Sequence, residues 1–311
     1  MAMEYVLETV GLSKRYKNQW ALKGVNMHVE KGDVYGFVGE NGSGKTTVIR
    51  LITGLIFPTE GGVSLFGTSD KSADIINARK RVGAIVETPS IYLNMSAKTN
   101  LQMQSDILGL RNENDEKIKE VLQEVGLLEL YDSKKKAGNF SLGMRQRLGI
   151  AMALLGDPEF IILDEPMNGL DPAGIVEIRE LILRLNQQRG ITFLISSHIL
   201  TELALVATKY GIISKGKLVK EIAAEDLKKQ CRPTLFINAK EKEKLYETVV
   251  KSVRAEDVAY TPQGVCIHGE VQLNPLLKNI LEEDIEITAV NRREGNIEEY
   301  YLSLIGGIRH A

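Results

Sequence analysis

The sequence predicts an α/β fold, in which short buried strands of a parallel sheet alternate with helices. The runs FIIL and ITFLIS are short and continuously apolar, as is typical of strands that are buried on both faces of such a sheet. Helical patterns lie between these runs, which favours βαβ units. A polar break near residues 222–233 ends in Pro233, and a second, small region of α+β type is expected beyond it.

The first third of the chain predicts strands, one glycine-rich loop and one helix. EYVLETV and GVNMHVE are β-rich, and the turn KGD leads into the apolar strand VYGFV. After the loop, TTVIRLITGL predicts a helix that ends near Gly54. Its apolar stripe contains Val48, Leu51, Ile52 and Leu55.

Two features mark the middle of the chain. VGAIVE predicts a buried strand that cannot continue through Pro89, with Glu87 where the strand emerges. A carboxylate at that point is either solvated or faces a ligand. NDEKIKEVLQEVGLL has apolar residues at helical spacing, with Asp115 as the expected cap and Gly126 as the expected stop.

Beyond the break, seven segments predict the order β-α-β-β-α-β-α, which fits a small sheet with helices on one face. They are TLFIN, EKEKLYETVVKSV, VAYTP, GVCIHG, NPLLKNILEE, IEITAV and NIEEYYLSLIG. We expect two domains with bounds at residues 1–228 and 229–311. For the second domain the sequence leaves four roles open: regulation, support of dimerisation, contact with a permease, or mere stabilisation of the dimer.

Composition excludes several classes of protein. A chain of 311 residues with 43% hydrophobic and 26% charged residues is typical of a globular protein with a large core. The net charge of -2 argues against extensive nucleic-acid binding. Cys231 and Cys266 are too few for a disulfide framework, which indicates a reducing compartment. No secretory signal and no apolar run of about 18 residues is seen, so any membrane span is expected on another chain.

GENGSGKT, residues 39–46, matches the phosphate-binding pattern G-x-x-x-x-G-K-[ST] in full. It follows a predicted strand and opens a predicted helix, so an ordinary glycine-rich turn is the weaker interpretation. Backbone N–H groups and the helix N-terminus are expected to hold phosphates, Lys45 to reach the β- and γ-phosphates, and Thr46 to bind Mg²⁺. The residues expected to contact the nucleotide here are Gly39, Asn41, Gly42, Ser43, Gly44, Lys45, Thr46 and Thr47.

Two carboxylates and one histidine follow buried strands. FIILDEP ends with Asp164, expected to hold Mg²⁺, and Glu165, expected to accept a proton from the attacking water. His198 follows ITFLISS. Parallel strands bring their C-terminal ends to one sheet edge, so these residues and the phosphate loop are expected to meet there. The alternatives are a solvated turn for the acids and a packing role for the histidine.

These motifs together resemble the ATP-binding cassette (ABC) transporter ATPases over about residues 4–225. GENGSGKT is similar to the family's Walker A motif and FIILDE to its Walker B motif. FSLGMRQRLGIAMALLGDP stands at the place of the signature, NGLD at that of the D-loop and SSH at that of the switch histidine. The resemblance implies a P-loop NTPase domain with a mixed sheet, an N-terminal antiparallel β part and a helical subdomain at about residues 90–158.

The resemblance also implies the cofactors ATP and Mg²⁺ and a head-to-tail homodimer. Tyr16 is where the family stacks an aromatic ring on adenine, and Asp171 belongs to the D-loop. Ser141 and Gly143 are then expected to face the γ-phosphate held by the partner subunit. The signature departs from the usual L-S-G-G-Q at Leu142 and Met144, and an inactive site is the weaker explanation since Glu165 and His198 are both present.

Glu87 stands where most of the family has a glutamine that touches Mg²⁺ and the attacking water. A glutamate here, with SLGMRQRLGIAMALL, resembles the branch that serves bacitracin export and lantibiotic immunity. Glu87 is therefore expected to bind Mg²⁺ and to act in catalysis. Replacing it with glutamine is expected to leave nucleotide binding largely intact and to alter hydrolysis or coupling.

The leading hypothesis is an ATP-hydrolysing subunit that drives a separate integral membrane permease, with a peptide antibiotic or lantibiotic as the cargo. The expected location is cytoplasmic, peripheral on the inner face of the cell membrane, and no nucleic-acid partner is expected. The alternative is a soluble ABC ATPase that acts on nucleic acid or ribosomes. It ranks behind because this chain has one cassette and no sustained heptads.

Overall fold

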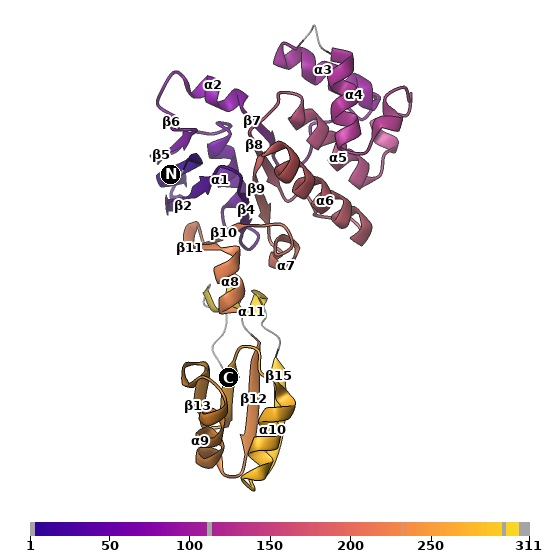
Figure 1. Ribbon diagram of the computed structural model, residues 1–311. Coiled ribbons are helices and arrows are strands. Elements are labelled where there is room, and N and C mark those ends of the chain that lie inside the picture. The colour runs from indigo at the N-terminus through magenta and orange to yellow at the C-terminus, as the bar shows by residue number, and fades with distance from the viewer. Residues whose placement is uncertain (1–3, 111–113, 232, 294–296, 305–311) are drawn as a thin grey trace. The chain divides into compact units, whose positions relative to one another are not determined.

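The computed structural model describes residues 4–110, 114–231, 233–293 and 297–304 (Figure 1). The chain divides into two compact units, Met1–Ala224 and Glu225–Ala311. Each unit has its own cluster of buried apolar side chains, so each has its own core.

A six-stranded sheet in the order β11-β10-β4-β9-β8-β7 forms the centre of the first unit. Its strands are β4 (Val34–Val38), β7 (Val82–Ile85), β8 (Phe160–Asp164), β9 (Thr192–Ser197), β10 (Lys209–Ser214) and β11 (Lys217–Ala223). The strands from β10 to β7 are parallel, and β11 pairs antiparallel with β10. Strands β4, β8 and β9 are buried along their whole length. The predicted parallel sheet of buried strands is therefore confirmed.

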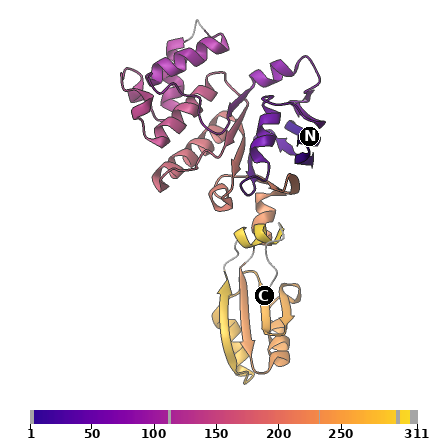
Figure 2. The same ribbon diagram turned by 180° about the vertical axis from the view of Figure 1, so that it is seen from behind.

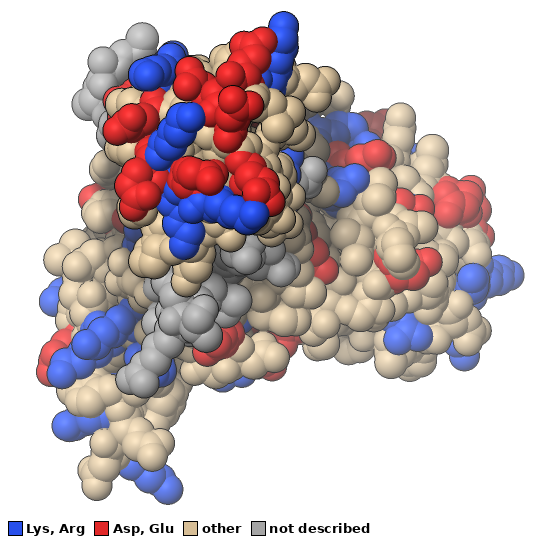
Figure 3. Space-filling model, turned by 90° about the horizontal axis from the view of Figure 1, so that it is seen from below, with Lys and Arg blue, Asp and Glu red and all other residues tan. Residues whose placement is uncertain are grey.

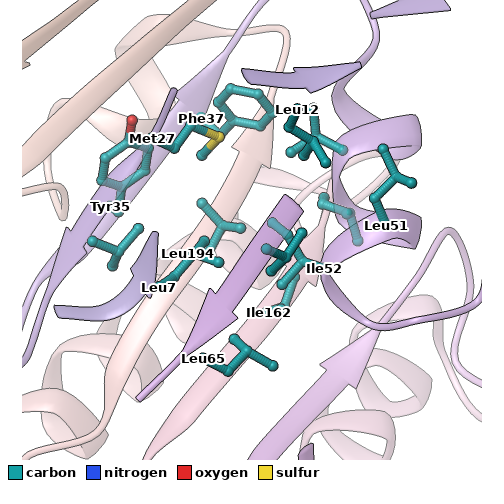
Figure 4. Close-up of a cluster of buried hydrophobic side chains, with 14 of the residues drawn as sticks. Leu7, Leu12, Met27, Tyr35, Phe37, Leu51, Ile52, Leu65, Ile162 and Leu194 are labelled. Atoms are coloured by element: carbon teal, nitrogen blue, oxygen red, sulfur yellow. The ribbon is translucent and has the colours of Figure 1, made fainter. Parts of the chain in front are cut away.

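A second, antiparallel sheet has the order β2-β1-β5-β6, with β3 paired to β1. Its strands are β1 (Tyr5–Tyr16), β2 (Gln19–Val25), β3 (His28–Glu30), β5 (Glu60–Leu65) and β6 (Thr68–Ser69). Side chains from both sheets and from helix α1 (Lys45–Ile52) meet in one core, and Leu12, Phe37, Ile52 and Leu194 are among them (Figure 4). This packing fixes α1 against the strand that precedes it.

The other helices of this unit are α2 (Ile75–Lys80), α3 (Ala97–Leu108), α4 (Asn114–Glu124), α5 (Leu142–Leu154), α6 (Pro172–Arg189) and α7 (Leu200–Leu203). Helices α3, α4 and α5 lie together as a helical layer (Figures 1 and 2). Gly126 ends the α4 segment with φ +67°, as predicted. The predicted cap Asp115 is wrong, because α4 already includes Asn114; Asp115 lies in the first turn and pairs with Lys98 at 3.2 Å.

Four charged residues tie the helical layer to α6. Asp157 follows α5, and its carboxylate accepts hydrogen bonds from Lys117 of α4 (2.6 Å) and Arg189 of α6 (2.7 Å). Arg189 also pairs with Glu124 at 2.9 Å. Burial works to raise the pKa of Asp157, but the hydrogen bonds from Lys117 and Arg189 prevail and the pKa is lowered. The ionised carboxylate is therefore the form that the fold stabilises.

The second unit has the predicted order of strands and helices. Its elements are α8 (Ala224–Gln230), β12 (Thr234–Ala239), α9 (Lys242–Ser252), β13 (Val258–Thr261), β14 (Gly264–His268), α10 (Leu273–Glu282), β15 (Ile287–Arg293) and α11 (Ile297–Leu304). The antiparallel sheet has the order β13-β14-β12-β15, the arrangement of a βαββαβ ferredoxin-like motif. Leu235 and Ile237 of β12 share a core with Leu245 of α9 and Leu276 of α10, so both helices cover one face, as predicted. The segment predicted as a break contains helix α8, which the sequence interpretation missed.

Surface features agree with the composition. Cys231 and Cys266 are not joined in a disulfide. Acidic and basic side chains are interspersed on the face that Figure 3 shows. Within the parts of the chain that the structure describes, no helix is long and apolar enough to cross a bilayer.

Candidate nucleotide-binding and catalytic site

The glycine-rich loop between β4 and α1 requires its glycines for steric reasons. A Cβ on Gly39 would lie 2.5 Å from the Oγ of Ser43, and a Cβ on Gly44 would lie 2.6 Å from a methyl group of Leu22. Gly44 also has φ +111°, a conformation that L side chains rarely adopt. It precedes α1 without providing a side-chain cap, so the first N–H groups of α1 remain available to an anion.

Lys45 is buried at the start of α1 and closes the loop upon itself. Its Nζ donates to the carbonyl oxygens of Gly39 (2.6 Å) and Glu40 (3.3 Å), and it lies 3.2 Å from Oε1 of Glu165. The buried Oγ of Ser43 has no hydrogen-bond partner among the described residues. A buried ammonium and an unpaired hydroxyl in one loop are the groups that a phosphate would satisfy.

Asp164 and Glu165 are ordered by a residue of the neighbouring strand. Asp164 pairs in register with Ser196, whose Oγ donates to Oδ1 of Asp164 at 2.5 Å and accepts from the backbone N–H of Glu165 at 2.9 Å. The other oxygen of Asp164, Oδ2, is buried and has no partner among the described residues. The sequence interpretation gave Ser196 no role, because the hydrogen bond depends on the register of two strands.

Glu165 connects the lysine and the histidine. Its Oε2 lies 2.7 Å from Nδ1 of His198, and its Oε1 faces Lys45. Glu165 has φ +51°, so its backbone is in the left-handed region that costs about 1–2 kcal/mol for an L-residue. The sheet edge thus brings together Lys45, Asp164, Glu165 and His198, the four residues that the sequence predicted to meet there.

A cavity of about 490 Å³ opens in front of these groups. The loop residues Asn41, Gly42, Gly44, Lys45, Thr46 and Thr47 line it. Glu165 and Asn168 line it from the end of β8, and Lys215 and Gly216 from the β10–β11 turn. The cavity therefore joins a phosphate-binding loop to a carboxylate that can accept a proton.

The aromatic side chain at this cavity is Trp20, on β2. Tyr16 lies in the same hairpin, with the ammonium of Lys14 over its ring at 5.3 Å, and is not among the residues that line the cavity. The predicted stacking of adenine on Tyr16 stays a prediction. Sequence reasoning overlooked Trp20, although a second aromatic residue four positions along the same hairpin was a signal for it.

The signature residues and Asp171 lie at helix N-termini outside this cavity. Ser141 caps α5, and its Oγ accepts a hydrogen bond from the N–H of Met144 at 3.2 Å. Gly143 lies in the first turn of the same helix. Asp171 caps α6 by accepting from the N–H of Gly174 at 3.1 Å. The side chains of Ser141 and Asp171 thus cap two helices. Among the hydrogen bonds described, none joins Ser141, Gly143 or Asp171 to the chain's own phosphate loop.

Glu87 lies in the loop after β7 with φ +64°. Its Oε1 accepts a hydrogen bond of 2.5 Å from the guanidinium of Arg50, in the last turn of α1. Glu87 is not among the residues that line the cavity, and its roles in Mg²⁺ binding and catalysis stay predictions. Arg50 was not singled out from the sequence.

Known proteins share this arrangement. Residues 22–168 match the family model described as ABC transporter. The bacitracin transport ATP-binding protein BcrA of Bacillus licheniformis is 41% identical over 309 residues, which cover 98% of this chain and 99% of that protein. The chain belongs to the ABC transporter family. It binds ATP and hydrolyses it in a reaction coupled to transport, as the family resemblance predicted.

Two further relatives support the assignment. The lantibiotic transport ATP-binding protein SrtF of Streptococcus pyogenes is 40% identical over 216 residues, 70% of this chain and 90% of that protein. A dimeric ATP-binding cassette in a post-hydrolysis state with ADP and Pi superposes with a TM-score of 0.62 at 25% identity, covering 70% of this chain and 98% of that one. The predicted fold, a P-loop ATPase of ABC type, is confirmed.

Proposed function

We propose that this chain is the ATP-hydrolysing subunit of an ABC exporter that confers resistance to a peptide antibiotic of the bacitracin or lantibiotic type. The proposal rests on 41% sequence identity to a bacitracin transport protein over 98% of this chain. It also rests on the contacts of Glu165 with Lys45 and with His198. Glu165 accepts a proton from the attacking water, and His198 orients Glu165 through their hydrogen bond.

Mg²⁺ is proposed as the metal of this site. The buried, unpaired Oδ2 of Asp164 fits a cation, because a carboxylate oxygen is otherwise costly to bury without a partner. Thr46 lies at the start of α1 beside Lys45 and lines the same cavity. Among the described residues no group of three or more His, Cys, Asp or Glu side chains forms a metal site. Thr46 and Asp164 would therefore hold the ion together with phosphate oxygens, and Mg²⁺ would neutralise charge on the β- and γ-phosphates.

The working form is proposed to be a head-to-tail homodimer. Ser141 and Gly143 start a helix of 13 residues whose first N–H groups are suited to an anion, yet they lie outside the chain's own cavity. A second copy that turns this helix start toward the Lys45 cavity gives the signature a phosphate to bind. Asp171 is proposed to act at the same interface.

A separate integral membrane permease is proposed to dock at the edge of the central sheet, on the inner face of the cell membrane. β7 is the edge strand, and a groove of about 300 Å³ runs along it. The groove is lined by Val82–Val86 of the strand region, by Gln104 of α3 and by Met152 of α5. A strand that is paired with a neighbouring strand on one side only and lies beside apolar side chains is suited to a protein partner.

The decisive test is Glu165→Gln in the full-length chain, produced together with its proposed permease. The variant is expected to bind ATP like the parent, to lose more than about 100-fold of its ATPase rate, and to lose resistance to bacitracin or to a lantibiotic. Glu159→Gln is the matched control, because Glu159 is an exposed surface carboxylate paired with Arg81.

Equal turnover in the parent and Glu165→Gln would disprove the catalytic assignment. Purification with RNA or ribosomes instead of a membrane protein, and unchanged antibiotic sensitivity after deletion, would favour the nucleic-acid alternative.

A further inference from the structure

One ion pair joins the phosphate-binding helix to the loop after the edge strand. Arg50 in the last turn of α1 donates a hydrogen bond of 2.5 Å to Glu87, whose backbone is left-handed at φ +64°. Both side chains are partly exposed, by 40% and 58%. As a contribution to stability alone, such a pair is worth about 0–1 kcal/mol, so its position matters more than its strength.

Arg50 belongs to the same short helix as the phosphate-binding residues Lys45 and Thr46. Arg50 follows Thr46 by four residues, which places it on the same side of the helix and about 6 Å further along the axis. Glu87 is therefore held by the helix whose first turn lines the nucleotide cavity. ATP is strongly anionic, and Asp164 and Glu165 already lie at the same sheet edge.

An unpaired carboxylate in this place would oppose ATP. Unit charges about 8 Å apart interact by about 0.5–1 kcal/mol in a largely aqueous medium, and salt weakens the effect. Arg50 offsets that charge, because a carboxylate and a guanidinium in contact act at a distance as a nearly neutral pair. The simpler interpretation is that Arg50 only complements the dipole at the C-terminal end of α1.

We propose that Arg50 is a positioning residue that holds and neutralises Glu87, so that a carboxylate can occupy the loop beside the ATP site without opposing ATP binding. The proposal rests on the proposed function, since it requires ATP in the Lys45 cavity. The dipole interpretation makes a different prediction, because it does not involve Glu87.

The test measures the affinity of the full-length chain for a fluorescent ATP analogue with Mg²⁺, at low and at high salt. Arg50→Ala is expected to weaken binding about two- to fivefold at low salt and by less at high salt. Arg50→Lys is expected to keep the parent affinity. Glu87→Gln in the Arg50→Ala background is expected to restore it, because the unpaired charge is gone.

Arg81→Ala is the matched control, because Arg81 pairs with Glu159 at 2.7 Å and the two are similarly exposed, by 42% and 45%. It is expected to leave binding unchanged. If Arg50→Ala does not fold, as judged by thermal unfolding, Arg50→Gln takes its place in the same series.

Two outcomes overturn the proposal. The first is parent-like affinity in Arg50→Ala, and the second is a loss of affinity that Glu87→Gln does not restore. A parent chain that binds no ATP analogue would instead overturn the proposed function, so the two failures are distinguishable.

Discussion

Gly169 in the D-loop gives a test of how the unusual signature is accommodated. Gly169 has φ +76°, and a Cβ built on it would lie 3.3 Å from the Cδ2 of Leu142, the first residue of α5. Leu142 is one of the two residues, with Met144, that depart from the usual signature. The missing side chain at Gly169 leaves room for it, so Gly169→Ala is expected to push Leu142 and the adjoining Ser141 out of place.

Two contributions make up the expected decrease in the free energy of unfolding of Gly169→Ala. Forcing an L-residue into the left-handed region costs about 1 kcal/mol. The tight contact with Leu142 adds up to about 1 kcal/mol, because either the side chain or the start of α5 must move. Gly190→Ala separates the two, since Gly190 has φ +66° at the end of α6 and a Cβ there would meet nothing within 4 Å.

Urea denaturation and steady-state ATPase rates of the full-length variants are the assays. Both glycine variants are expected to lose about 1 kcal/mol in the free energy of unfolding, with Gly169→Ala losing more. Only Gly169→Ala is expected to lose ATPase activity, by about tenfold or more, because small displacements of catalytic groups are costly. Leu142→Ala added to Gly169→Ala is expected to recover the contact part of the stability loss.

The reasoning is refuted if Gly169→Ala hydrolyses ATP like the parent. It is also refuted if Gly190→Ala loses as much activity as Gly169→Ala, since the loss would then follow from backbone strain anywhere in the fold.

Three further predictions concern other parts of the first unit. Asp157→Asn is expected to lower the free energy of unfolding by about 0.5–1 kcal/mol at pH 7. Because the pKa of Asp157 is lowered in the fold, its stabilisation is fully present above the unfolded pKa of about 3.9 and is lost as pH falls through the lower folded pKa. The difference in stability between variant and parent should therefore narrow as the pH falls below about 3.9. Gly149→Ala is expected to lower the free energy of unfolding by about 1–3 kcal/mol, because the new Cβ would lie 2.6 Å from the Cβ of Pro89. This loss is expected although alanine has the better helix propensity, and a variant as stable as the parent would contradict the packing described. ATP is expected to change the fluorescence of Trp20, the one tryptophan of the chain, and an unchanged spectrum at saturation would place the base elsewhere.

Local sequence pattern was sufficient for most of the fold. Strands such as β8 and β9 are buried at every position and mostly apolar, and the phosphate loop combines glycines, a lysine and a threonine at fixed spacing. In the second unit, the strand and helix order was predicted from alternation and helical spacing alone. Asp115 and α8 were missed because a polar helix end and a short polar helix resemble a turn in sequence.

Contacts between side chains that are distant in the sequence could not be predicted from the sequence alone. Ser196 meets Asp164 only because β8 and β9 are neighbours in one register. Arg50 and Glu87 are 37 residues apart in the sequence and meet only in the folded chain. Trp20 of the β1–β2 hairpin lines the same cavity as the phosphate loop. Neither hydrophobic periodicity nor motif spacing predicts that the hairpin lies beside this loop.

The two acids that follow β7 and β8 share a conformation that no sequence pattern indicated. Glu87 and Glu165 both have positive φ, at +64° and +51°, which is unfavourable for glutamate unless the surroundings hold it. In each case a cation of the same helix meets the carboxylate, since Lys45 is the first residue of α1 and Arg50 lies in its last turn. A phosphate that draws Lys45 away from Glu165 therefore acts on the helix that also holds Glu87.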